Sequence, residues 1–551
     1  MQAFSAPTTV RRTVAFAVTT FILAILFAVA AQAAQPTQTT HVPLAVSTGR
    51  AIMVSHMPAN QVVSLAISLP LLNESALDDL LAQIYDRTSS SYHHYLSVSE
   101  FTERFGPSNS DYASLLEFAQ SHGLTIVGTY PNRRVLDVEG PAASIESAFH
   151  ISLDLYQHPT EARTFYAPDR EPSLDLAIPV LHITGLDNYT LPHPKNIAQA
   201  LAEGTHKTTG SGPGGDFIGS DLRAAYYGSG SLNGSGQVVG LFEFAGYELS
   251  DVKTYFHKLN QPFNIPVKGV SLNGVSISCP PRSCDDSEQA LDIEIAAAMA
   301  PGLKQIIVYV GSKDVSIYNR MATDNVAKQT SCSWGWADDE SSLDPIFKQM
   351  SAQGQTNFVA TGDQGSSTTA STVWPSDDPY VVAVGGTDLT TTGPGGAWSS
   401  ETGWSGSAGM PSKNNVPIPS YQQIAGVVTS QNGASSTLRN IPDVAAEANT
   451  NQYSCYDGSC SGGNGGTSYA SPQWAAILAM ANEQSIANGG TTLGFINPSL
   501  YRIGTGSNYA ADFHDITSGS NGKYTAVTGY DLVTGWGSPI AGSLIDQLLG
   551  Q

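Results

Sequence analysis

Charged residues are scarce in this 551-residue chain, and basic residues are the scarcest. Only 13% of positions are charged, and 25 Lys and Arg stand against 47 Asp and Glu, which gives a formal net charge of −22. DNA or RNA would be repelled by that charge, so nucleic acid is excluded as an expected partner. The acidity fits simple solubility, and it also fits an acidic medium in which protonation of carboxylates reduces the charge.

Long apolar runs are nearly absent, with one exception at the N-terminus. The run VAFAVTTFILAILFAVA follows Arg11 and Arg12 and precedes Ala31-Gln32-Ala33, which is the pattern of a secretory signal. The sequence therefore predicts a signal peptide over residues 1–33 and a secreted, extracellular protein with no membrane association after cleavage. An uncleaved anchor is the alternative, although the run is slightly short for a membrane span.

Cysteine is also rare, with five in the chain. Cys279 and Cys284 flank the short loop PPRS, and Cys455 and Cys460 flank YDGS. Two local disulfides are therefore predicted, as expected for an exported protein. Cys332, in the apolar stretch SCSWGW, is then unpaired, and it fits a buried small residue better than a nucleophile. No pair has the CxxC spacing that indicates zinc.

The chain is long enough for two folded units. Within residues 41–192, RVLDVEG, PAASIESAFH and ISLDLYQ follow one another with the periods of a strand, a helix and a strand, which predicts a small α+β domain. Residues 193–216 have the composition of a protease-sensitive linker, and we predict processing there, between about Ala200 and Phe217. In residues 217–551, apolar strand patterns alternate with helical patterns, which predicts a largely parallel sheet flanked by helices.

A candidate nucleophile lies in the stretch NGGTSYASPQW, which begins at residue 464. Ser468 follows a Gly-rich turn and precedes an apolar helical pattern, similar to the nucleophile turn of subtilisin-like serine peptidases. A serine hydroxyl needs a base to become nucleophilic. The candidate histidines are His206, His257 and His514, and none has the His-Gly-Thr context of a subtilisin base. A Ser-His-Asp triad is therefore excluded.

A pair of carboxylates can replace the histidine. In DSEQALDIEIAAAMAPG, Glu288 and Asp292 are four residues apart, hence neighbours on a helix surface. Two like charges at that distance raise the pKa of one group, and a glutamate with a raised pKa can act as a general base at acidic pH. For an isolated ExxxD motif, a solvated helix face is the alternative.

Together these motifs resemble the sedolisin family of serine-carboxyl peptidases, and the kumamolisins in particular. EQALD is similar to the family's Glu-x-x-x-Asp helix, GGTS to its nucleophile turn and TGDQG to its oxyanion motif. The resemblance implies that Ser468 is the nucleophile, that Glu288 is the general base and then the acid, and that Asp292 orients Glu288. It also implies that Asp363 stabilises the oxyanion, which a carboxyl group can do only while protonated.

Two further positions match residues that extend the family's carboxyl network. Glu243 corresponds to the acid after the first strand of the catalytic domain, and Trp334 to the aromatic residue of a Ser-Trp-Gly stretch. For Trp334, packing in the core is an equally good interpretation. For Asp363, a turn-forming aspartate is the alternative.

A calcium site is predicted near the C-terminus. FHDITSGSNGKYTAVTGYDLVTGWGSP places two aspartates around a Gly-rich loop, and carboxylates with turn carbonyls suit Ca2+. By composition alone, a polar surface loop is the alternative. The resemblance implies one structural Ca2+ bound by Asp515, Ile516, Val527, Gly529 and Asp531. Val527 stands where the family usually has glycine, but its ligand would be the backbone carbonyl.

The resemblance extends to residues 41–192, whose stretch HHYLSVSEFTERFGPS looks like part of the family's activation propeptide. It implies a zymogen in which this domain is an intramolecular inhibitor, followed by the linker at 193–216 and a catalytic domain at 217–551. Acidification is the expected trigger, because it would protonate carboxylates at the interface of the two domains.

The predicted fold is therefore α/β, with a subtilisin-like, largely parallel sheet flanked by helices, preceded by a small α+β propeptide domain. The predicted function is that of a secreted, acid-acting serine-carboxyl endopeptidase, expected to be a monomer, that hydrolyses protein or peptide substrates through an acyl-enzyme. Two alternatives remain: a tripeptidyl-type exopeptidase on the same fold, and a catalytically silent secreted calcium-binding homologue.

Overall fold

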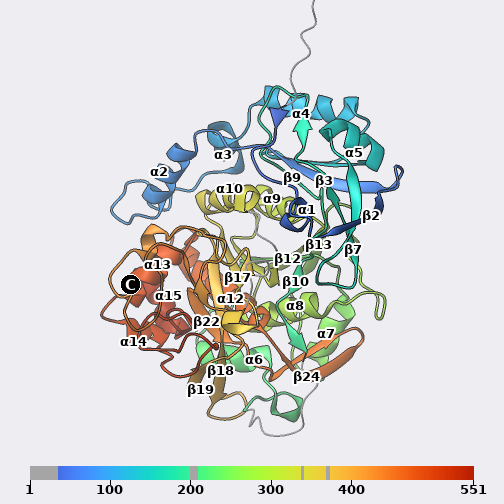
Figure 1. Ribbon diagram of the computed structural model, residues 1–551. Helices are drawn as coiled ribbons and strands as arrows, with labels where there is room; N and C mark the ends of the chain where they lie inside the picture. Colours follow the sequence, from blue (N-terminus) through green and yellow to red (C-terminus); the bar gives the residue numbers. More distant parts are fainter. Residues whose placement is uncertain (1–34, 199–208, 337–339, 368–372, 551) are drawn as a thin grey trace, which may run out of the picture. The chain divides into compact units, whose positions relative to one another are not determined.

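The computed structural model describes residues 35–198, 209–336, 340–367 and 373–550 (Figure 1). The predicted signal peptide and the middle of the predicted linker lie outside these residues. Residues 34–551 form one compact unit. No helix in the described ranges combines the length and hydropathy that a bilayer crossing needs.

A mainly parallel sheet organises the C-terminal part of the chain. Its strand order is β13-β14-β12-β15-β17-β18-β19, and β22 also pairs with β18. All pairings are parallel except that of β18 with β19. The strands are β12 (Val238–Glu243), β13 (Val267–Ser271), β14 (Gln305–Val310), β15 (Gln329–Cys332), β17 (Thr356–Ala360), β18 (Val382–Thr391), β19 (Trp398–Gly403) and β22 (Val444–Glu447).

Helices cover both faces of this sheet because successive strand side chains point to opposite sides. In β12, Val239 and Leu241 join the core on the side of α6 (Gly219–Tyr226), α7 (Leu249–Lys258), α8 (Ser287–Met299) and α12 (Thr467–Ala487). Val238 and Phe242 join the opposite core, together with α9 (Asp314–Asp324) and α10 (Glu340–Ala352). The predicted subtilisin-like architecture is confirmed.

The N-terminal region is the predicted α+β domain. An antiparallel sheet of order β4-β5-β3-β9 packs against two helices around its own apolar core. The elements are β3 (Val62–Ser68), α4 (Asn109–Ser121), β4 (Thr125–Thr129), β5 (Val135–Pro141), α5 (Ala142–Phe149) and β9 (His182–Thr184). The strand-helix-strand pattern predicted from the sequence corresponds to β5, α5 and β6 (Leu153–Gln157).

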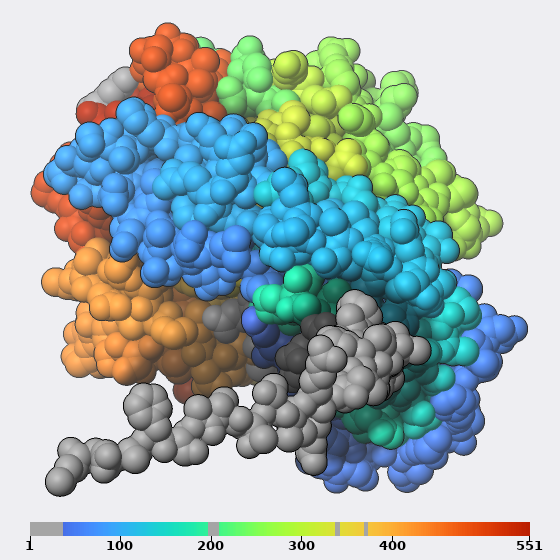
Figure 2. Space-filling model, turned by 90° about the horizontal axis from the view of Figure 1, so that it is seen from above, coloured from blue at the N-terminus to red at the C-terminus, as the bar shows by residue number. Residues whose placement is uncertain are grey.

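The N-terminal domain packs on the face formed by α9 and α10. Asn132 Nδ2 donates to Asn319 Oδ1 at 2.6 Å and to Gln349 Oε1 at 2.9 Å. Ser316 Oγ donates to Asp137 Oδ1 at 2.6 Å. On the face seen in Figure 2, the surface of this domain, in blue to teal, adjoins the yellow-green and orange surfaces of later residues. The interface is therefore polar as well as apolar.

Candidate active site

Ser468 is the second residue of α12, two residues after Gly466, which has a positive φ. Strand β24 (Ser459–Gly465) ends one residue before Gly466, whose φ is 124°. A methyl group at Gly466 would lie 2.5 Å from the Lys195 carbonyl oxygen and 2.7 Å from Asp363 Oδ2. Only glycine fits this backbone and this space. The turn therefore presents Ser468 at a helix N-terminus, where partial positive charge favours an anion.

Glu288 and Asp292 lie one turn apart on α8, and both are buried. Burial and the nearby charge of Asp292 raise the pKa of Glu288 well above its ordinary value, although the neighbouring Ser468 side chain opposes this. Burial raises the pKa of Asp292 to about 8. The Ser468 hydroxyl itself donates to the Ser333 carbonyl oxygen at 3.3 Å. The structure thus brings the predicted nucleophile and base together.

Glu243 extends this group of carboxyls at the end of β12. Its Oε2 accepts a hydrogen bond of 2.9 Å from Trp334 Nε1. Burial and the nearby charge of Asp292 raise the pKa of Glu243 well above its ordinary value. Both carboxyl groups therefore favour protonation, and the two together hold less negative charge than two isolated carboxylates would.

Asp363 lies three residues after the end of β17. Its Oδ1 accepts hydrogen bonds from Thr467 N at 2.7 Å and from Thr467 Oγ1 at 2.9 Å. Its Oδ2 is buried without a hydrogen-bond partner. Burial raises the pKa of Asp363 to about 7, against the opposing effects of Thr467 and of the Lys195 charge. The protonated group has an Oδ2–H free to stabilise an oxyanion.

Sequence reasoning missed Ser333, which connects several parts of this site. Ser333 Oγ donates to Asp292 Oδ1 at 2.8 Å, and its carbonyl accepts from the Ser468 hydroxyl. Ser333 directly follows β15, the neighbour of β12 and β17 in the sheet. Side chains just beyond the carboxyl ends of adjacent parallel strands converge. The signal was present in SCSWGW, but only the strand order shows which strands are neighbours.

The cysteines pair as predicted, with disulfides between Cys279 and Cys284 and between Cys455 and Cys460. Burial raises the pKa of the free thiol of Cys332 to about 12, which is unsuited to a nucleophile.

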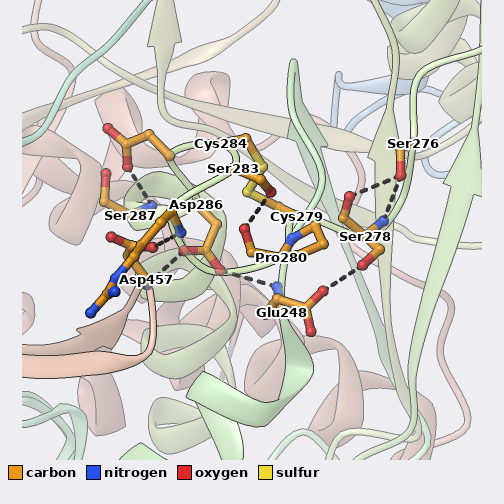
Figure 3. Close-up of a disulfide and its surroundings, with 12 residues drawn as sticks. Glu248, Ser276, Ser278, Cys279, Pro280, Ser283, Cys284, Asp286, Ser287 and Asp457 are labelled. Atoms are coloured by element: carbon orange, nitrogen blue, oxygen red, sulfur yellow. Dashed lines mark hydrogen bonds between the residues drawn. A yellow bond between two sulfur atoms is a disulfide. The ribbon is translucent and has the colours of Figure 1, made fainter.

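The first disulfide loop leads directly into α8 (Figure 3). Asp286, just before the helix, accepts a hydrogen bond of 3.0 Å from Glu248 N on its Oδ2 and one of 2.9 Å from Asp457 N on its Oδ1 (Figure 3). Asp457 lies in the second disulfide loop. These contacts fix the start of the helix that carries Glu288 and Asp292.

The two predicted calcium-binding aspartates contact the same loop. Asp515 Oδ1 accepts from Gly529 N at 3.0 Å, and Asp531 Oδ2 accepts from Val527 N at 2.9 Å. Burial raises the pKa of Asp531 to about 6. No group of three or more His, Cys, Asp or Glu side chains suited to a metal occurs in the described part of the chain. Two carboxylates supplemented by turn carbonyls fit calcium and do not fit zinc.

Comparison with known proteins identifies similar chains. Residues 50–189 match the family model "Pro-kumamolisin, activation domain". Kumamolisin from a Bacillus species is 30% identical, over 86% of this chain and 89% of its own length. Tripeptidyl-peptidase sed5 of Aspergillus fumigatus is 25% identical, over 82% of this chain and 87% of its own. The solved structure of Pseudomonas sedolisin, a serine-carboxyl proteinase complexed with two molecules of pseudo-iodotyrostatin, matches with a TM-score of 0.53 and 26% identity, covering 63% of this chain and 100% of that one.

Proposed function

This chain belongs to the sedolisin family of serine-carboxyl peptidases and carries its activation domain, and we propose that it is a secreted, acid-acting endopeptidase made as a zymogen. The observation that carries the proposal is the position of Ser468. Its side chain lies near a buried glutamate of raised pKa, and the backbone N–H of the preceding residue, Thr467, donates to a protonatable aspartate, Asp363. A nucleophile, a general base and an oxyanion donor are the groups that acyl transfer needs.

In the proposed reaction, Ser468 Oγ attacks the carbonyl carbon of a peptide bond and its proton passes to Glu288. The developing oxyanion is stabilised by Ser468 N–H and by the protonated Asp363. Glu288 returns the proton to the leaving amine as the C–N bond breaks, which leaves an acyl-enzyme. Water then hydrolyses the ester, with Glu288 again as base. Asp292 positions Glu288 and is itself held by Ser333 and Glu243.

We propose that activity depends on acid because the oxyanion donor and the general base each need a particular protonation state. Asp363 must be protonated to donate, and burial raises its pKa to about 7. The donor is therefore present below that pH and lost above it. Repulsion between neighbouring carboxylates makes the buried group of Glu243, Glu288 and Asp292 retain protons, and Glu288 can act as a base while the Glu288–Asp292 pair keeps a single negative charge.

The endopeptidase proposal is tested with fluorogenic peptides of one internal sequence, with blocked and with free N-termini, assayed at about pH 4 and about pH 7.5. An endopeptidase cuts both peptides at similar rates in acid. A tripeptidyl-peptidase cuts only the free peptide, releasing tripeptides. A catalytically silent homologue cuts neither.

We also propose one structural Ca2+, held by the carboxylates of Asp515 and Asp531 and the carbonyls of Ile516, Val527 and Gly529. Its support is the convergence of both aspartates on one loop. Bound Ca2+ would neutralise the charges of both aspartates. It takes no part in the chemistry proposed for Ser468.

Removing calcium is expected to lower the melting temperature by roughly 5 to 10 °C, because a ligand that binds only the folded state stabilises it. Differential scanning calorimetry with and without EGTA measures the shift, and Ca2+ but not Mg2+ should reverse it. The variant Asp531→Asn should melt lower and no longer respond to EGTA. An equal melting temperature with and without EGTA in the unaltered protein would refute the site.

The N-terminal domain is proposed to act as an intramolecular inhibitor, and protonation of carboxylates at its interface is the acid trigger expected from the sequence. Burial raises the pKa of Asp137, which contacts Ser316 across the interface, and that of Asp187. A buried carboxyl group with a raised pKa holds its proton in acid, so these two groups do not drive release of the domain as the pH falls. The half-exposed pair of Lys348 Nζ and Asp78 Oδ1, at 3.2 Å, is a contact that acid weakens, but such pairs stabilise little. We therefore attribute activation to cleavage of the linker.

A further inference from the structure

The segment after the N-terminal domain crosses the active site as an extended strand. Strand β10 (His193–Pro194) pairs antiparallel with β16 (Trp334–Gly335), and β11 (Ile197–Ala198) pairs antiparallel with β24. Strand β16 belongs to the stretch that follows β15, and strand β24 leads into Ser468. Backbone pairing on both sides is how an extended peptide is held for recognition.

Lys195, between these two short strands, places its carbonyl at the nucleophile. Its carbonyl oxygen accepts a hydrogen bond of 3.0 Å from Ser468 N, and its own N–H donates to the Ser333 carbonyl oxygen at 2.8 Å. A methyl group at Gly466 would touch both this oxygen and Asp363 Oδ2, so these two atoms line the same small space. The Lys195 carbonyl therefore occupies the position in which a scissile carbonyl is polarised.

The Lys195 side chain fills a buried pocket behind this carbonyl. The residue is 5% exposed, and Nζ donates to the Ala360 carbonyl oxygen at 2.6 Å. Burial lowers the pKa of Lys195 to about 8, while nearby acidic side chains, among them Asp363, Asp377 and Glu288, favour its ammonium form when they are ionised. The pocket buries the ammonium group, has acidic side chains nearby and ends at one backbone carbonyl. It therefore recognises both the charge and the length of a lysine side chain.

We propose that Lys195–Asn196 is the first bond cut during maturation, and that the pocket ending at the Ala360 carbonyl makes this peptidase selective for lysine on the N-terminal side of the cut. The inference rests on the proposed peptidase function and adds its substrate class. Ser468 Oγ bonds to the Lys195 carbonyl carbon, and the bond to Asn196 N breaks. Glu288 carries the proton from the serine to that nitrogen, and water releases the Lys195 carboxylate from the ester.

This bond lies upstream of the range that loop composition favours, from Ala200 to Phe217. Part of that range, residues 200–208, lies outside the described residues. Cleavage at Lys195 frees Asn196 as an N-terminus, and cuts further along the linker would then be trimming steps.

The test follows the full-length precursor after a shift to about pH 4, using intact mass and N-terminal sequencing of the earliest product. We expect a first product that begins at Asn196. Lys195→Met keeps the length of the side chain and removes its charge, and it should slow the first cut on the order of 100-fold, because a buried acceptor loses its partner. Lys207→Met is the matched linker control and should process at the parent rate.

A second measurement uses the mature enzyme on quenched peptides of sequence LPHPKNIAQ and on versions with Arg, Met or Glu in place of Lys. We expect the highest kcat/KM for Lys, and about 100-fold less for Met. A first product that begins elsewhere, or equal kcat/KM for Lys and Met, would overturn the inference while leaving the peptidase function intact. Loss of all cleavage, in precursor and peptides alike, would instead refute the proposed function, and the inference with it.

Discussion

Glu288→Gln is expected to lower kcat by about 10²- to 10⁴-fold, which is the range that general acid-base catalysis contributes. The amide is nearly the size of the carboxyl group but cannot accept the Ser468 proton at any pH. Since Glu288 is buried and burial raises its pKa, the carboxyl, and not a water molecule in bulk solvent, is placed to take that proton. Steady-state hydrolysis of the blocked peptide at about pH 4 measures the loss.

Glu294→Gln is the matched control. Glu294 lies on the same helix α8, is also buried with a raised pKa, and accepts a hydrogen bond of 3.2 Å from Cys455 N. It belongs to no part of the proposed reaction, so kcat should stay within about threefold of the parent, although the melting temperature should fall. If both variants lost activity equally, the effect would be structural, and Glu288 would not be the base.

Asp363→Ala is expected to lower kcat by about 10²- to 10³-fold, the effect of losing one oxyanion donor. Asp363→Asn should lose much less, because the amide oxygen can still accept from Thr467 while the NH₂ group occupies the position of the unpartnered Oδ2. The amide also donates at every pH. Comparing the two variants separates loss of the donor from loss of the carboxyl group.

The pH profiles of these variants test whether Asp363 acts as a protonated donor. In the parent, burial raises the pKa of Asp363 to about 7, so the donor is present at lower pH and is lost as the pH rises through that value. The ratio of Asp363→Asn activity to parent activity should therefore rise between about pH 5 and about pH 8. A constant ratio would show that Asp363 acts in its ionised form or does not contact the oxyanion.

Part of this site could be predicted from sequence because its signals are local. Helical spacing makes Glu288 and Asp292 neighbours, and the glycine before Thr467 indicates a turn that presents Ser468. The two disulfides follow in the same way from short loops. These features need no knowledge of which strands are adjacent.

Other features depend on tertiary contacts that no single stretch encodes. Ser333 meets Asp292 only because β15 lies beside β12 in the sheet. Lys195 lies in HPKN, where composition marks only a linker. Its place at Ser468 is set by pairing of its neighbours with β16 and β24. Loop composition identifies exposed backbone, but the bond presented to a nucleophile is determined by strand register.

The most direct test of the account is the mass of the purified precursor after a shift from about pH 7.5 to about pH 4, beside a Ser468→Ala control. The account predicts that the parent loses its N-terminal domain only in acid, and that the control stays intact because its only change is the loss of one hydroxyl. If both forms stay intact, or both are cut alike, Ser468 does not process this chain, and the claim of a carboxyl-activated serine peptidase is contradicted.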